Sequence, residues 1–82
     1  MKKIKYSSRA KEFIQKLDGS LKKRFKSKIE SLAEEEIKGT FLRKPLSNYQ
    51  KIRVGSYRVV FQEKEKNVIY IENIEHRSKV YK

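Results

Sequence analysis

Segment 51–61 limits the possible folds more than any other part of the chain, because apolar and basic residues alternate on both sides of one tight turn. The turn lies at residues 54–57, where a glycine supplies the positive φ that a two-residue β-hairpin loop requires. Counting outward from this turn places Arg53 directly opposite Arg58, with Lys51 on the same face. The sequence therefore predicts an antiparallel hairpin in a defined register.

This register gives the hairpin two chemically different faces. The apolar face, expected to cover the core, carries Ile52, Val54, Tyr57, Val59 and Phe61. The opposite face carries Lys51, Arg53 and Arg58. Like charges placed directly across a strand pair repel, and the planar fork of arginine matches the oxygens of a phosphate. We predict an anion site on this face; the alternatives are solvated side chains without a ligand, or a register slipped by one residue.

Upstream of the hairpin, a short strand at residues 3–6 is followed by the first of two helical patterns. Either Ser7 or Ser8 suits an N-cap, and Gly19 is expected to end the helix as a left-handed C-terminal residue. The apolar stripe recurs at helical spacing at Ala10, Phe13, Ile14 and Leu17.

The second helical pattern is longer and is expected to begin at an N-cap, Ser20, and to end at Gly39. The acidic run 34–36 falls in its last turns. Because one glycine connects the two helices, they are predicted to form an antiparallel hairpin. The apolar stripe of the second helix comprises Leu21, Phe25, Ile29, Leu32 and Ala33.

A loop at 40–50 separates these helices from three predicted strands at about 51–54, 57–63 and 68–74. The order β-α-α-β-β-β predicts one α+β domain over residues 1–82, an antiparallel four-stranded sheet packed on an N-terminal helical hairpin. In the last strand, apolar residues occur at odd and at even positions, so the pattern does not show which side chains point to the core. The strand is either central in the sheet or bulged.

Charge indicates the kind of partner. The chain has 22 Lys and Arg against 10 Asp and Glu, a formal net charge of +12, and such a field attracts polyanions. Exposed lysines of the second helix, Lys22, Lys23 and Lys26, are candidate RNA contacts.

Other functional classes find no support in the composition. The chain has no cysteine and one histidine, so neither a disulfide nor a thiolate or multi-histidine metal site is expected, and no cofactor is implied. No apolar run approaches the roughly 20 residues of a membrane span, and the basic N-terminus lacks the apolar stretch of a signal peptide. We expect a cytoplasmic protein without a membrane partner.

The C-terminal residues contain groups suited to phosphate chemistry. His76 can exchange a proton near neutral pH, Arg77 can neutralise an oxyanion, and Tyr81 can stack on a base or bond to a phosphate. Lys79 adds a further positive charge. A lone histidine is more often structural than catalytic, so this assignment draws on the rest of the pattern.

Three runs together resemble the RelE/ParE toxin superfamily: Lys44-Pro45-Leu46, the run 49–61, and His76-Arg77-Ser78-Lys79-Val80-Tyr81. The likeness covers nearly the whole chain and includes the element order. It implies a toxin of a type II toxin–antitoxin pair, and RelE-like members cleave messenger RNA in the ribosomal A site. There the ribose 2′-hydroxyl attacks the adjacent phosphate, which yields a 2′,3′-cyclic phosphate and a free 5′-hydroxyl.

The resemblance also implies roles for individual residues. Lys51 and Arg53 match two basic residues of the family's second strand, Arg58 matches the arginine that stabilises the transition state, and Tyr81 matches the tyrosine that orients substrate. One departure is Glu75, which stands where RelE has the arginine that protonates the leaving group. His76, or else Arg77, would then supply that proton. Since arginine stays protonated in proteins, Lys51 in its neutral form is the better candidate base.

Two other readings stay open within this resemblance. A ParE-like protein would inhibit DNA gyrase without nuclease chemistry, although Tyr81 and Lys51 favour the nuclease. A decayed toxin would bind RNA without cutting it, and Glu75 keeps this alternative open. Expected partners are mRNA, the ribosome and a cognate RelB-like antitoxin, with DNA contacted only through the antitoxin. The free toxin is expected to be a monomer.

Overall fold

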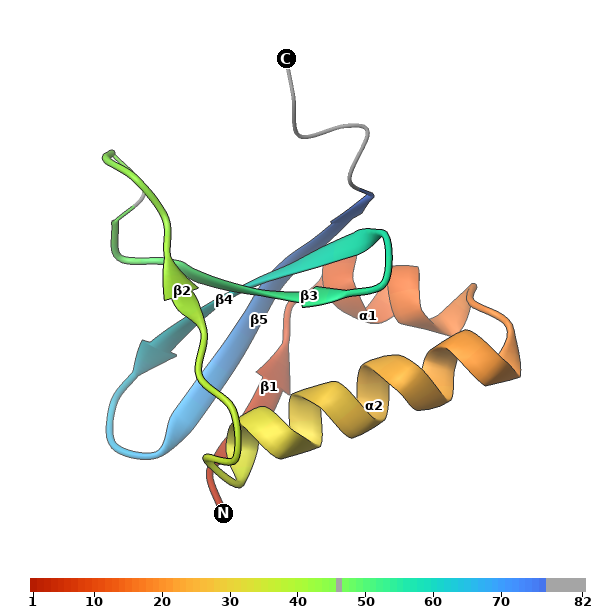
Figure 1. Ribbon diagram of the computed structural model, residues 1–82, viewed down its shortest axis with the longest axis horizontal. Coiled ribbons are helices and arrows are strands. Elements are labelled where there is room, and N and C mark those ends of the chain that lie inside the picture. The colour runs from red at the N-terminus through yellow and green to blue at the C-terminus, as the bar shows by residue number, and fades with distance from the viewer. Residues whose placement is uncertain (46, 77–82) are drawn as a thin grey trace.

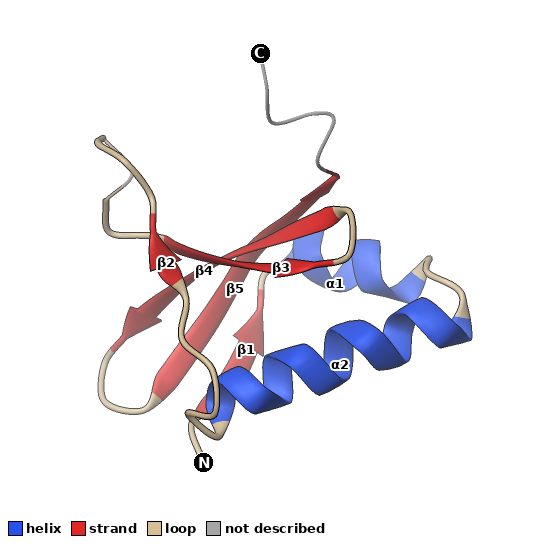
Figure 2. Ribbon diagram, in the orientation of Figure 1, coloured by secondary structure: helices blue, strands red, loops and turns tan. Residues whose placement is uncertain are grey.

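The computed structural model describes residues 1–45 and 47–76, which form two helices packed on one face of a five-stranded sheet (Figures 1 and 2). The elements are β1 (Lys3–Tyr6), α1 (Ser8–Gln15), α2 (Gly19–Ala33), β2 (Thr40–Phe41), β3 (Gln50–Val54), β4 (Tyr57–Lys64) and β5 (Val68–His76). The α+β class and the order of a helical pair followed by a β-meander are therefore confirmed.

The sheet differs from the expected one in strand number and in one pairing. Its order is β1-β5-β4-β3-β2, and β1 runs parallel to β5 while all other neighbours are antiparallel. The fifth strand, β2, has only two residues, too few for any periodic pattern to reveal it. The parallel pair arises because the two helices carry the chain away from β1 before the meander returns beside it.

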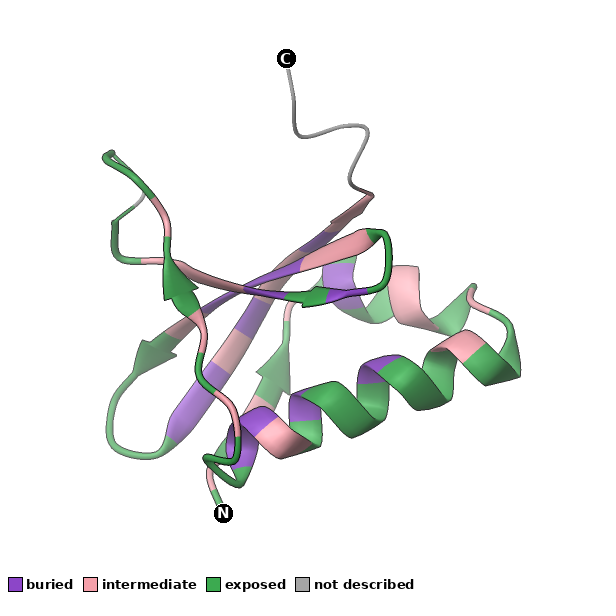
Figure 3. Ribbon diagram, in the orientation of Figure 1, coloured by how far each residue is buried: buried purple, intermediate pink, exposed green. Residues whose placement is uncertain are grey.

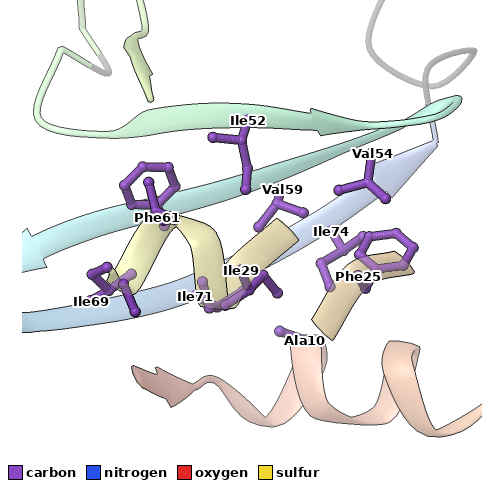
Figure 4. Packing of buried hydrophobic residues seen from close by; sticks show 12 residues of the cluster. Ala10, Phe25, Ile29, Ile52, Val54, Val59, Phe61, Ile69, Ile71 and Ile74 are labelled. Atoms are coloured by element: carbon purple, nitrogen blue, oxygen red, sulfur yellow. The ribbon is translucent and has the colours of Figure 1, made fainter. Parts of the chain in front are cut away.

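The predicted hairpin register is confirmed at every position. Arg53 pairs with Arg58, Lys51 with Val60, and the turn joins Val54 to Tyr57. Gly55 has φ of 59°, the left-handed conformation that the turn demanded. Seven buried side chains of the core come from this alternation and from β5, and they pack against the helices (Figures 3 and 4).

The last strand is bulged, which settles its facing. Val60 pairs with Asn73 while the next residue of β4, Phe61, pairs with Ile71, so Glu72 is an extra residue in β5. As a result Ile71 and Ile74 both reach the core, although three positions separate them. The bulge therefore explains why the apolar residues of this interior strand do not alternate regularly in the sequence.

The helix boundaries were predicted only in part. Ser7 is the N-cap of α1: its hydroxyl accepts from the Ala10 N–H at 3.1 Å and donates to the Glu72 carbonyl at 2.7 Å. Ser20 as the cap of α2 is wrong, because the Asp18 carboxylate accepts a hydrogen bond from the Leu21 N–H at 2.9 Å and caps the helix two residues earlier. Gly19, expected to end α1, instead begins α2.

Helix α2 also ends earlier than expected, at Ala33 instead of Gly39. Glu35 takes the left-handed conformation (φ 64°), its N–H bonds to the Leu32 carbonyl, and the Glu36 N–H bonds to the Ser31 carbonyl. These two bonds are the C-terminal motif that glycine usually completes. The acidic run therefore forms the end of the helix and the residues after it.

Gly39 has a different role from the one the sequence indicated. A Cβ placed on it would overlap the ring of Phe61, which is fully buried. The glycine is needed because the chain passes directly over a core aromatic ring, not because it ends a helix.

Candidate anion-binding face of the sheet

The face of the sheet opposite the helices, called here the open face, carries a row of three charged residues on three adjacent strands. Arg53 of β3 pairs with Arg58 of β4, and Arg58 pairs in turn with Glu75 of β5. Directly paired residues point to the same face of a sheet. We call Arg53, Arg58 and Glu75 the charged row.

Glu75 provides the countercharge that the paired arginines required. Its Oε1 accepts a hydrogen bond from Arg58 Nη2 at 3.2 Å. The two side chains are 17% and 29% exposed, respectively, so the pair is largely shielded from solvent. Arg58 Nε is also buried, yet no acceptor lies within hydrogen-bonding distance among the described residues. Within the described part of the chain, Arg58 therefore has a shielded donor that Glu75 does not occupy.

Lys51 lies beside the charged row, toward the edge of the sheet. It pairs with Thr40 of β2 on one side and with Val60 of β4 on the other. A hollow of about 440 Å³ opens here, lined by Thr40, Phe41, Leu42, Arg43, Lys51 and Arg58. Three cationic side chains therefore border one depression. Sequence reasoning missed Arg43, because the short strand that brings it to the hollow carries no pattern.

His76 does not join this cluster. It pairs with Tyr57 in the register of β4 and β5, and the two rings contact at 5.1 Å between centroids with planes at 89°. Tyr57 packs on Phe13 and Phe25 on the helix side. Since successive strand residues point to opposite faces, the His76 ring and the Glu75 carboxylate lie on different faces. Its catalytic role remains a prediction; Arg77, Lys79 and Tyr81 lie outside the described residues.

The basic residues of α2 divide between two surfaces. Lys23 borders a hollow that also includes Arg24, Lys28 and Arg53, so this part of the helix extends the positive charge of the open face. Lys22 and Lys26 instead line a separate groove next to β1. The structure therefore connects one of the three predicted lysines to the charged row.

That groove has a volume of about 560 Å³. Its floor is apolar and its rim mostly basic; the lining comprises Ile4, Tyr6, Lys11, Ile14, Gln15, Lys22, Lys26 and Glu30. Partial burial, with a smaller contribution from the charge of Glu30, raises the pKa of Tyr6. One side of the groove is β1, an edge strand with unpaired backbone groups. This surface suits an extended or helical polypeptide.

Further along the open face, the ring of Tyr70 has two cationic neighbours. The ammonium groups of Lys5 and Lys64 lie 5.6 and 5.4 Å from its centroid. Its hydroxyl donates to Glu65 at 3.0 Å. The positive charge of the open face thus extends from the charged row to the opposite end of the sheet.

Two findings bear on the classes that composition disfavoured. Within residues 1–45 and 47–76, no three His, Cys, Asp or Glu side chains gather in a way that could hold a metal ion. No helix in that part of the chain is long and apolar enough to cross a membrane.

Fold and site together define a class: two helices on a meander sheet whose open face presents clustered cations, the fold of RelE-like toxins. The E. coli RelBE toxin–antitoxin complex contains a chain that superposes with a TM-score of 0.76 at 19% identity, over 93% of this chain and 96% of that one. A YoeB/ParE toxin from Agrobacterium tumefaciens gives 0.74 at 14% identity, over 90% and 96%. YoeB from Staphylococcus aureus gives 0.72 at 23% identity, over 90% and 94%.

At these identities the likeness establishes the fold alone. The sequence supplies the family: the profile of the ParE toxin of type II toxin–antitoxin systems, parDE, matches residues 4–81. The chain therefore belongs to the ParE toxin family of type II toxin–antitoxin systems. No curated protein sequence matches it significantly.

Proposed function

We propose that this protein is a RelE-like toxin that cleaves messenger RNA in the ribosomal A site. The observation that carries the proposal is the direct pairing of Arg53 with Arg58 beside Lys51 on the open face. Cations in this arrangement repel one another and are stabilised by an anion with several oxygens, as a phosphodiester is. The +12 net charge favours a polyanionic substrate over a neutral one.

In the proposed reaction the ribose 2′-oxygen attacks the adjacent phosphorus, and the bond from phosphorus to the 5′-oxygen breaks. The 2′-hydroxyl proton passes to a base, for which neutral Lys51 is our candidate. Arg58 and Arg53 neutralise the charge that builds on the phosphoryl oxygens. The products are a 2′,3′-cyclic phosphate and a 5′-hydroxyl, and the leaving oxygen takes a proton from an acid.

His76 or Arg77 is the candidate acid. Because the His76 ring packs on Tyr57, away from the charged row, its participation requires a rearrangement at the end of β5. Changing His76 to alanine separates the possibilities: loss of cleavage with unchanged RNA binding supports the histidine, and full activity assigns the step elsewhere. Tyr81 is proposed to orient the substrate, with Arg77 and Lys79 contributing positive charge.

The proposed protein partner is a cognate antitoxin. The groove along β1 combines an apolar floor with Lys11, Lys22 and Lys26, which suits an amphipathic segment that carries acidic residues. A segment disordered before binding would acquire its structure on this surface. Contact with operator DNA would then be made by the antitoxin.

A second candidate function is inhibition of DNA gyrase without RNA cleavage. The family profile that matches this chain is described as ParE. The carboxylate of Glu75 in the charged row also supports it, because a negative charge beside Arg58 weakens a phosphate site.

Induction in a bacterial host, with primer extension on a translated reporter message, tests the proposal. Wild type should produce cuts inside translated codons, and Arg58→Ala should abolish them. Arg9→Ala is the matched control, since Arg9 is an exposed arginine on α1 away from the open face. Growth arrest without cuts, together with loss of gyrase supercoiling, would overturn the nuclease in favour of the second candidate.

A further inference from the structure

Glu75 is the residue of the charged row that phosphate chemistry does not explain. A carboxylate repels a phosphate, yet Glu75 is paired with the arginine placed to bind one. Neighbouring strands are about 4.8 Å apart, so Arg58 has a second arginine on one side and a carboxylate on the other. Arg58 can therefore be attracted in two directions, toward Glu75 or toward an anion held jointly with Arg53.

We propose that Glu75 is an internal counter-ion that occupies Arg58 in the free protein and competes with RNA phosphate for it. Glu75 thereby sets the affinity of the open face for RNA. The inference rests on the proposed function only in taking the charged row as the phosphate site.

The contact geometry supports competition in preference to a permanent structural pair. The hydrogen bond from Arg58 Nη2 to Glu75 Oε1 is 3.2 Å long, which is longer than a tight charge-assisted hydrogen bond. Arg58 Nε is buried and has no hydrogen-bond partner within residues 1–45 and 47–76, so the described contact with Glu75 does not use every donor of the guanidinium. A phosphate offers more oxygens than this one contact uses, and its geometry matches the planar fork of the guanidinium.

The charges explain why the free protein needs such a group. Arg58 is 17% exposed and is paired directly with another arginine, so without a nearby carboxylate it would be a shielded, uncompensated cation. Glu75 stabilises the empty site for this reason. When a phosphate binds, the same compensation comes from the ligand, and the carboxylate becomes an unfavourable neighbour.

This leads to opposite effects of one substitution on two quantities. Glu75→Gln keeps the size of the side chain and an oxygen that can accept from Arg58, but it removes the charge. The empty protein should become less stable, and the affinity for RNA should rise by roughly three- to tenfold, as expected for the loss of one close charge from a half-shielded site. A purely structural Glu75 would lower stability without raising affinity.

The test measures binding of a short oligoribonucleotide by fluorescence anisotropy at fixed salt, and 2′-O-methylation of its riboses blocks the attacking hydroxyl and so prevents cleavage. Glu63→Gln is the matched control: Glu63 also pairs with a cation, Lys2 at 2.9 Å, but away from the charged row. It changes the net charge equally and should alter affinity less than twofold. Glu75→Asp keeps the charge and should bind like wild type.

Arg58→Ala completes a double-mutant cycle. The rise in RNA affinity caused by Glu75→Gln should vanish when Arg58 is already alanine, because there is then no guanidinium for which the carboxylate competes. A gain that persists without Arg58, equal gains in Glu75→Gln and Glu63→Gln, or no gain in Glu75→Gln would each overturn the inference. Thermal unfolding with and without the oligonucleotide confirms that every variant is folded.

Failure of the proposed function gives a different result in the same data. If Arg58→Ala binds the oligonucleotide as tightly as wild type, the charged row is not the phosphate site, and the proposed RNA-cleaving function of the open face is wrong. If Arg58→Ala binds weakly while Glu75→Gln matches wild type, the phosphate site stands and only the competition is wrong.

Discussion

The two faces of the sheet hold their side chains by different means. On the helix-covered face, residues such as Val59, Phe61 and Ile71 are fully buried and each is fixed by apolar packing. On the open face, strand pairing places Arg58 beside Glu75, and a hydrogen bond of 3.2 Å joins the two side chains. The position of a core residue can be read from its own strand, whereas the chemistry of the open face appears only when three strands are considered together.

The largest expected effect concerns the covered face. Phe61→Ala should lower the free energy of unfolding by about 3–5 kcal/mol, because it removes a fully buried aromatic ring and leaves a cavity over Gly39. Phe41→Ala is the matched control: this ring is 64% exposed, and the expected change is within about 0.5 kcal/mol. Urea unfolding measures both. Equal losses would contradict the burial described for the two rings.

On the open face, the effect should fall on activity. Arg58→Ala should reduce RNA cleavage by about 10²–10³-fold, the usual result of removing one donor to a developing oxyanion. Arg58→Lys keeps a positive charge without the planar fork and should retain intermediate activity. Single-turnover cleavage on programmed ribosomes measures this. Wild-type rates in the alanine variant would show that the open face does not perform the chemistry.

A smaller effect tests the helices that cover the core. Asp18→Ala should lower the free energy of unfolding by about 1 kcal/mol, since it removes the side chain that accepts the Leu21 N–H. Ser20→Ala, at the position that sequence preference favoured, should leave stability nearly unchanged. A reversed ranking in chemical denaturation would place the cap at the serine after all.

The smallest effect concerns the ion pair between Lys2 and Glu63, at the end of β4. The hydrogen bond that Lys2 donates to Glu63 raises the pKa of Lys2 above its ordinary 10.5, against a smaller lowering by desolvation. Because the pKa of Lys2 is raised in the folded protein, the ion pair stabilises the fold fully below pH 10.5, the ordinary lysine pKa. This stabilisation is lost as the pH rises through the higher pKa of the folded protein.

Wild type should therefore exceed Glu63→Gln in stability by less than about 1 kcal/mol at neutral pH, because Glu63 is partly exposed. The difference should shrink at alkaline pH, once Lys2 loses its proton. Denaturant titrations of both proteins at a series of pH values measure this. A difference that stays constant through the alkaline range would exclude the charge of Lys2 as its source.

How much could be predicted from sequence differs between the faces for a physical reason. The two-residue turn at Gly55 fixes the register of β3 and β4, so the pairing of Arg53 with Arg58 follows by counting. No comparable turn fixes β4 against β5: their connection contains Glu65 and Asn67 at positive φ, and the bulge at Glu72 then shifts the register. The pairing of Arg58 with Glu75 depends on this connection and on the bulge, so it could not be deduced by counting residues from a turn.

Local preferences failed where two residues could satisfy the same rule. Asp18 and Ser20 are both good N-caps, and the choice between them depends on where the helix meets the core, not on the residues alone. Glu35 takes a conformation that glycine usually takes, so Gly39 appeared to be the helix end when it was needed to pass over Phe61. In both cases tertiary packing decided between locally acceptable alternatives.

The parallel pairing of β1 with β5 has a consequence for the synthesis of the protein. Among the described strands, β1 pairs only with β5, with residues 3–6 beside residues 68–71. During translation β1 is synthesised before its partner strand, and it stays unpaired while the helices and strands β2 to β4 are made. The sheet cannot close until β5 has left the exit tunnel, so folding of the complete sheet is delayed until this strand has been made.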